Sequence, residues 1–511
     1  MILFETVLLL LLGAALLSLL AGRLGVPYPT LLALGGVAVA LIPGTPRLDL
    51  PPDLILALFV APVLLDAAHD TSLRDLRANW RPVLSLVVVA VGLTTIVVAC
   101  VVRQFLPDMP WAAAIALGAL LAPPDAVAAL AVMRAVSPPH RIRAILEGES
   151  LLNDASSLLI YNLAVAAVSV GAFRPADVLP AFGLVTIGSV VVGWVLARIV
   201  VRLTAPIAHP AIATILQFVT TFGVWILAER LQLSGVVTIV VFGLTAGRRS
   251  SASLPTIVRV QSFATWETVT LVLNVLAFTM VGLQLRPILE RLDRAELTTY
   301  PLFALAILAV VVLVRLAWVL VYGATHRLSR VTGNGPRTWA ETVKSGILVG
   351  WSGMRGIVTL AAALAIPEGF PYRDFILLSA FVVVLGTLVI QGLTLKPLLR
   401  ALQFPEDTII ADEVTVARES ALDATLRALG EDTGPAADRL RREYGEALGF
   451  ARAGDDPRAS TDNVLHQRVI PAARSAIDTL RAKGTIGDEA YRTVEEELDR
   501  LELSSRPSEA D

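Results

Sequence analysis

The sequence is poor in the residues that most enzymes and metal sites need. Its 511 residues include one cysteine, Cys100, and five scattered histidines, none of them in a His-Glu-x-x-His pattern. One cysteine excludes an intrachain disulfide and a cysteine-based zinc cluster. No phosphate-binding loop of the Gly-x-x-x-x-Gly-Lys-Ser/Thr type occurs, so ATP-driven pumping and metalloprotease chemistry have no support. Because no nucleophile and base pair is recognisable either, we expect no enzyme, no cofactor and no nucleic-acid partner.

Charged residues are also scarce, at 17%, whereas 55% of the chain is hydrophobic and the mean hydropathy is +0.70. This composition is far from that of a soluble globular protein and predicts an all-α polytopic membrane protein surrounded by lipid. The N-terminus lacks the basic segment of a secretory signal peptide, so we expect residues 3 to 22 to be a retained first span.

A hydropathy window of roughly 19 residues predicts about thirteen membrane spans. They lie near residues 3–22, 27–43, 53–69, 82–104, 111–134, 142–170, 177–204, 211–229, 233–247, 265–285, 300–324, 343–367 and 373–400. An odd number places the two termini on opposite sides of the membrane.

Arginines are concentrated in alternate loops between these spans. The rich loops include Arg74, Arg77 and Arg81, then Arg141 and Arg143, then Arg198 and Arg202, then Arg248, Arg249 and Arg259. Cytoplasmic loops of membrane proteins are enriched in Lys and Arg. We therefore expect a protein of the cytoplasmic membrane. Its N-terminus would lie outside the cell and its C-terminus in the cytoplasm.

The composition changes abruptly after residue 400. Residues 401–511 hold 24 of the 44 acidic and 14 of the 42 basic residues, which gives this tail a net charge of −10 and the preceding part +8. We predict a transmembrane domain over residues 1–400 and a cytoplasmic helical regulatory tail over residues 401–511.

Two predicted spans contain helix breakers at mid-membrane depth. The fifth contains Pro123 and Pro124, and the twelfth contains four glycines, at positions 346, 350, 353 and 356. If spans 1–6 and 8–13 are two repeats, the fifth and twelfth are equivalent elements. Two inverted repeats whose broken helices meet near the bilayer midplane are typical of secondary transporters.

Polar residues open the sixth span, where lipid makes ionisable groups costly. At helical spacing, Ser150 and Asp154 share one face, and Glu149 and Asn153 share the adjoining one. Another carboxylate, Asp125, lies in the preceding span. A monovalent cation needs several oxygen ligands, which Asp154, Ser150, Asp125 and a carbonyl near Pro124 could supply. Since one carboxylate binds either a proton or a cation, the two would compete, and competition for a shared site is sufficient for exchange.

Other buried charges have structural interpretations beside the functional ones. Glu149 is interpreted as a structural ion-pair residue, with Arg355 of the twelfth span as partner. Arg315, deep in the eleventh span, could cap freed carbonyls of a broken helix or act in transport. Asp66, near the end of the third span, could face the same cavity or belong to the membrane interface.

Together these residues resemble the monovalent cation/proton antiporters of the sodium/hydrogen exchanger type, in their electroneutral branch. The most specific piece is Glu149-Ser150-Leu151-Leu152-Asn153-Asp154, which matches the family's Glu-Ser-x-x-Asn-Asp run. Supporting pieces are Asp125, Asp66, residues 278–283 (Phe-Thr-Met-Val-Gly-Leu) and residues 351–356 (Trp-Ser-Gly-Met-Arg-Gly).

The resemblance implies that Asp154 binds the ion, Asn153 supports it, Ser150 contributes a ligand and Glu149 pairs with Arg355. It also implies thirteen helices, a homodimer, an elevator-like movement of a core domain and one cation per proton. The chain departs from a common family pattern at Asp125, where Pro124 replaces a threonine, and at Asp66, where many members have a glutamate.

These observations predict a secondary active antiporter that exchanges sodium or potassium for protons in pH and cation homeostasis. A potassium-selective exchanger, a channel and a non-transporting pH or ion sensor are the alternatives. A channel should show a continuous polar lining, which the sequence does not display.

Overall fold

The structure is a computed structural model of the 511-residue chain. It describes residues 2–43, 51–133, 138–170, 175–253, 255–326, 339–405, 407–430, 432–454, 461–483, 485 and 488–505. The chain divides into two compact units, Met1–Pro405 and Glu406–Asp511.

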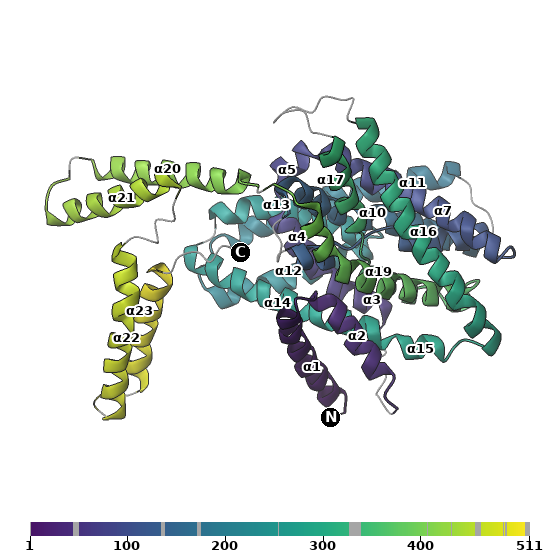
Figure 1. The fold of residues 1–511 in the computed structure, drawn as a ribbon, viewed down its shortest axis with the longest axis horizontal. Helices are drawn as coiled ribbons and strands as arrows, with labels where there is room; N and C mark the ends of the chain where they lie inside the picture. Colours follow the sequence, from purple (N-terminus) through teal and green to yellow (C-terminus); the bar gives the residue numbers. More distant parts are fainter. Residues whose placement is uncertain are drawn as a thin grey trace. The chain divides into compact units, whose positions relative to one another are not determined.

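The first unit is built from helices throughout its described residues (Figure 1). They are α1 (Ile2–Leu24), α2 (Tyr28–Ala40), α3 (Pro52–Ile55), α4 (Ala61–Asp70), α5 (Leu73–Ala78), α6 (Trp80–Leu84), α7 (Val91–Phe105), α8 (Trp111–Leu121), α9 (Ala126–Met133), α10 (His140–Val170), α11 (Pro175–Thr204), α12 (Pro210–Arg230), α13 (Gly235–Ser253), α14 (Thr256–Leu283), α15 (Leu285–Leu289), α16 (Arg294–His326), α17 (Trp339–Trp351), α18 (Ile357–Leu364) and α19 (Arg373–Leu402). Two π-helical turns, η1 (Leu56–Val60) and η2 (Ser85–Ala90), lead into α4 and α7.

Seven described helical segments are long and apolar enough to cross a membrane. They run through 80–105, 140–168, 183–204, 210–230, 256–289, 294–325 and 373–402, and five shorter apolar helices accompany them. The all-helical membrane architecture predicted from composition is confirmed. The number of thirteen spans stays a prediction.

Both predicted helix breaks are present. The fifth predicted span is α8 followed by α9, with residues 122–125 unwound between them, and its last residue, Arg134, lies outside the described residues. The twelfth is α17 followed by α18, with residues 352–356 non-helical. Proline lacks the backbone donor that a helix needs, and glycine is a poor helix former. The breakers therefore interrupt the helices at the positions where the sequence places them.

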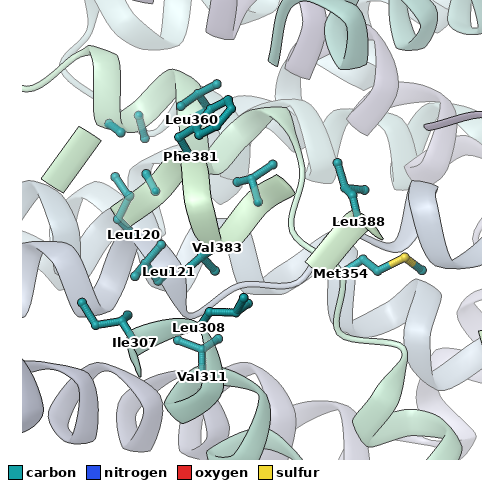
Figure 2. Close-up of a cluster of buried hydrophobic side chains, with 14 of the residues drawn as sticks. Leu120, Leu121, Ile307, Leu308, Val311, Met354, Leu360, Phe381, Val383 and Leu388 are labelled. Carbon is teal, nitrogen blue, oxygen red and sulfur yellow. The ribbon is translucent and has the colours of Figure 1, made fainter. Parts of the chain in front are cut away.

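An apolar core surrounds the two breaks. Figure 2 shows side chains from α8 (Leu120, Leu121), α16 (Ile307, Leu308, Val311), α18 (Leu360) and α19 (Phe381, Val383, Leu388), together with Met354 from the unwound stretch. All of these residues are buried. The polar backbone of both breaks is thus enclosed by tightly packed side chains, which leaves it dependent on partners within the protein.

The second unit consists of two helical hairpins. Helix α20 (Ile409–Leu429) packs against α21 (Pro435–Ala453), and α22 (Thr461–Ala482) packs against α23 (Asp488–Ser505). Gly454 ends α21 with a φ of 80°, a left-handed conformation that favours glycine. The regulatory role of this unit stays a prediction.

Helices α2 and α14 cross at a pair of glycines. A Cβ atom on Gly282 would lie 2.5 Å from Val37 N and 2.7 Å from Gly36 C, and one on Gly36 would lie 3.0 Å from Gly282 Cα. Small residues allow such close approach of membrane helices, where dispersion contacts supply much of the packing energy. Within residues 278–283, Gly282 therefore allows α14 to pack closely against α2.

We expect Gly282→Val to separate α2 from α14 and to destabilise the protein by about 1–3 kcal/mol, the usual effect of overpacking. Thermal unfolding in detergent measures this change. Gly223→Ala in α12 is the control because its added methyl group meets no atom within 4 Å. Equal melting temperatures for wild type and Gly282→Val would contradict the close crossing.

Candidate functional site

The two unwound stretches meet at one point. The amide N–H of Asp125, at the end of the first break, donates to Met354 O in the second at 2.6 Å. Neither backbone group could make this bond from inside a regular helix. The inverted-repeat prediction requires such a meeting of the fifth and twelfth spans.

Arg355 fills the gap between the broken helix ends. Its Nε donates to Leu121 O at 3.1 Å and its Nη2 to Ala122 O at 3.3 Å, while Nη1 donates to Gly353 O. The residue is 0% exposed. The last carbonyls of any helix lack helical partners, and this guanidinium supplies partners at the end of α8.

The predicted pairing of Glu149 with Arg355 is wrong. Glu149 on α10 makes a bidentate ion pair with Arg315 on α16: Arg315 Nη2 donates to Glu149 Oε2 at 2.8 Å, and Arg315 Nη1 donates to Glu149 Oε1. Side-chain exposure is only 3% for Arg315 and 1% for Glu149. Arg315 Nη2 also donates to Val349 O, near the end of α17, at 3.1 Å.

The physical reason is the direction in which each arginine is held. The backbone N–H of Arg355 donates to Thr387 Oγ1 on α19 at 3.0 Å, and its side-chain donors are taken by carbonyls. Arg315 combines the structural role anticipated for it, capping a broken helix, with the ion pair expected of Arg355. Both arginines lie deep in apolar spans, so sequence spacing gave no means of choosing between them.

Asn153 and Asp154 lie beside the first break. Asn153 Nδ2 donates to Pro124 O at 2.8 Å, which ties α10 to the unwound stretch. Asn153 is 0% exposed, and its Oδ1 has no hydrogen-bond partner among the described residues. Asp154 is 8% exposed, and Asp125 lies close enough to interact with it electrostatically. The site thus holds two carboxylates and a free amide oxygen.

Asp125 has a second role that the sequence did not reveal. Its Oδ1 accepts from the backbone N–H of Val127 at 2.8 Å, so the carboxylate caps the start of α9. The same side chain lies against Gly356, where any Cβ atom would overlap its carboxylate. Gly356 therefore provides the space that Asp125 occupies.

Ser150 and Asp66 are placed less closely. Ser150 is half-buried on α10, one turn before Asp154. Asp66 is half-buried on α4, and Leu64 of that helix shares a core with Leu151 of α10. The structure brings the helices of both residues together, and their roles as ligands stay predictions.

Two further polar contacts lie at this site. Ser156 Oγ on α10 donates to Val87 O in η2 at 2.9 Å, and Thr387 receives the N–H of Arg355. Neither residue carries a sequence signal that distinguishes it from other hydroxyl groups in apolar helices. Only the three-dimensional arrangement identifies them.

We expect a double-mutant cycle on Glu149→Gln and Arg315→Gln to show a large coupling energy. Removing one partner of a buried ion pair costs about 3–5 kcal/mol, whereas losing both leaves no unpaired charge. Unfolding in detergent measures each variant. The matched cycle of Glu149→Gln with Arg355→Gln should show a smaller coupling, and a larger one would contradict the pairing described here.

Comparison with known proteins adds independent information. The profile of the family described as sodium/hydrogen exchanger, transmembrane, matches residues 7–401. An uncharacterised Na⁺/H⁺ exchanger of Mycobacterium tuberculosis is 30% identical over 95% of this chain and 93% of its own. A sodium, potassium, lithium and rubidium/H⁺ antiporter of Bacillus subtilis is 28% identical over 94% of this chain and 74% of its own.

The fold also matches a solved structure. The sodium proton antiporter MjNhaP1 from Methanocaldococcus jannaschii superposes with a TM-score of 0.62, covering 80% of this chain and 99% of the other at 18% identity. At that identity the match concerns the fold, and it agrees with the antiporter fold that the family resemblance implied.

Proposed function

Because this chain belongs to the sodium/hydrogen exchanger family, we propose that it exchanges sodium or potassium for protons at Asp154. It is a multi-pass membrane transporter and uses existing ion gradients. Asp125 and the Oδ1 atom of Asn153 would join Asp154 around the cation, with Ser150 on the same face of α10. Asp66 is proposed to face the same cavity.

The observation that supports this proposal best is the buried Oδ1 of Asn153, the residue before Asp154, which has no hydrogen-bond partner among the described residues. A buried acceptor without a partner is destabilising. Its Nδ2 is fixed on Pro124 O, which leaves the oxygen free to contact a cation. Oxygen atoms are the ligands that hard cations prefer.

The family resemblance supports one cation per proton, because Asn153 stands where the electrogenic branch has a second aspartate. Glu149 is held in its ion pair with Arg315, which leaves Asp154 and Asp125 as the carboxylates proposed to bind a cation or a proton.

Orientation and assembly complete the proposal. The arginine-rich loops support a cytoplasmic C-terminus and an outer N-terminus in the cell membrane. The family resemblance supports a homodimer with an elevator-like movement. The named cations of the Bacillus subtilis relative support both sodium and potassium as candidates.

Proteoliposomes with an internal pH dye test this function. Sodium and potassium chloride are added in turn to wild type and to Asp154→Asn. We expect cation-dependent proton movement in wild type and its loss, at least a hundredfold, in the variant, because an amide cannot exchange a proton for a cation.

Glu147→Gln is the matched control. Glu147 lies on the same helix but pairs with Arg143 in a partly exposed i,i+4 contact at 2.8 Å, so its loss should leave exchange unchanged. Exchange that persists in Asp154→Asn would remove Asp154 from the site, and folded wild-type protein that responds to neither cation would favour the sensor.

A further inference from the structure

Helix α19 presents a row of polar side chains toward the second break. Thr387, Gln391 and Thr394 are four and three residues apart and therefore share one face of the helix. At a rise of 1.5 Å per residue the row is about 10 Å long. The roles proposed above use Thr387 but neither Gln391 nor Thr394.

The two ends of the row hold the two ends of the unwound stretch. Trp351, the last residue of α17, donates from Nε1 to Thr394 Oγ1 at 2.9 Å. Arg355 donates its backbone N–H to Thr387 Oγ1 at 3.0 Å. Gln391 lies between these two anchors on α19.

Helix α19 also packs near the side chain of Met354, a residue of the unwound stretch. A Cβ atom on Gly392, the residue after Gln391, would lie 3.6 Å from Met354 Sδ. Met354 is the residue whose carbonyl accepts the N–H of Asp125. The residue that follows Gln391 therefore packs against Met354, whose carbonyl is joined to the candidate ion site.

Gln391 is 1% exposed, yet neither Oε1 nor Nε2 has a hydrogen-bond partner among the described residues. A side-chain amide offers two donors and an acceptor. Leaving these groups buried and unpaired destabilises the protein, whereas a leucine would fill the space without that penalty. In this conformation the amide forms no hydrogen bond with the described residues that would offset the cost of its burial.

We propose that Gln391 is a positioning residue whose amide hydrogen bonds the backbone of residues 352–354 when a cation is bound. This role of Gln391 rests on the proposed function. A cation at Asp154 attracts the Asp125 carboxylate, and the backbone of Asp125 is joined to Met354 O. Cation binding therefore displaces the unwound stretch, and Gln391 is the unpaired polar group beside it.

The test is sodium binding and thermal stability of purified full-length Gln391→Leu. We expect its melting temperature without sodium to equal or exceed that of wild type, because an unpaired amide is removed. We expect its Kd for sodium chloride to rise about tenfold and the sodium-induced increase in melting temperature to shrink. Gln391→Met, which keeps the length of the side chain, should behave in the same way.

Ser379→Ala is the matched control. Ser379 lies on the same helix, is 0% exposed, and its Oγ also lacks a partner among the described residues, but it is twelve positions away from Gln391. Its loss should leave the Kd unchanged.

An unchanged sodium Kd in Gln391→Leu, measured beside a wild type that binds sodium, would overturn this inference alone. A lower melting temperature of Gln391→Leu without sodium would also overturn it, since that result indicates a structural role in the empty protein. A wild type that binds neither sodium nor potassium would overturn the proposed function and this inference with it.

Discussion

A helix that is broken inside a membrane frees backbone groups that water cannot reach, and every one of them needs a partner within the protein. This constraint governs the centre of the molecule. The first break receives Arg355 at Leu121 O and Ala122 O, and Asn153 at Pro124 O. In the second break, Met354 O accepts the backbone N–H of Asp125. Each break is thus completed by residues of another helix, and Arg355 of the second break supplies donors to the carbonyls of the first.

The residues that bind the broken helices also place charged groups close to the proposed ion site. Arg355 is buried because its guanidinium donates to the backbone carbonyls at the first break. Arg315 is buried because it forms a bidentate ion pair with Glu149. Arg315 thus pairs with the Glu149 carboxylate, while the Asp125 carboxylate caps the start of α9. Asp125 and Asn153, which provide hydrogen-bond partners at the broken helices, are therefore also residues proposed to bind the ion. A substitution of one of these residues that is made to alter transport is therefore expected to affect the structure as well.

The sequence predicted the fold because its signals are local, and the same signals select the residues proposed for the site. Hydropathy gives the helices, proline and glycine give the breaks, and the run from Glu149 to Asp154 gives the polar centre of α10. What failed was the choice of partner for Glu149. Arg315 and Arg355 are both single arginines in apolar spans, and only the orientation of each side chain distinguishes them. The capping role of Asp125 and the anchoring role of Thr387 were missed for the same reason, since both depend on contacts that no periodicity encodes.

In the proposed mechanism, a cation and a proton compete for one site where the two breaks meet. The most direct measurement is isothermal titration of the purified protein with sodium and potassium chloride over a series of pH values, in buffers of different ionisation enthalpy. On the acidic side of the site's titration, competition predicts about one proton released per cation bound and a Kd that rises about tenfold for each unit fall in pH. Cation binding that is independent of pH and releases no proton would contradict it.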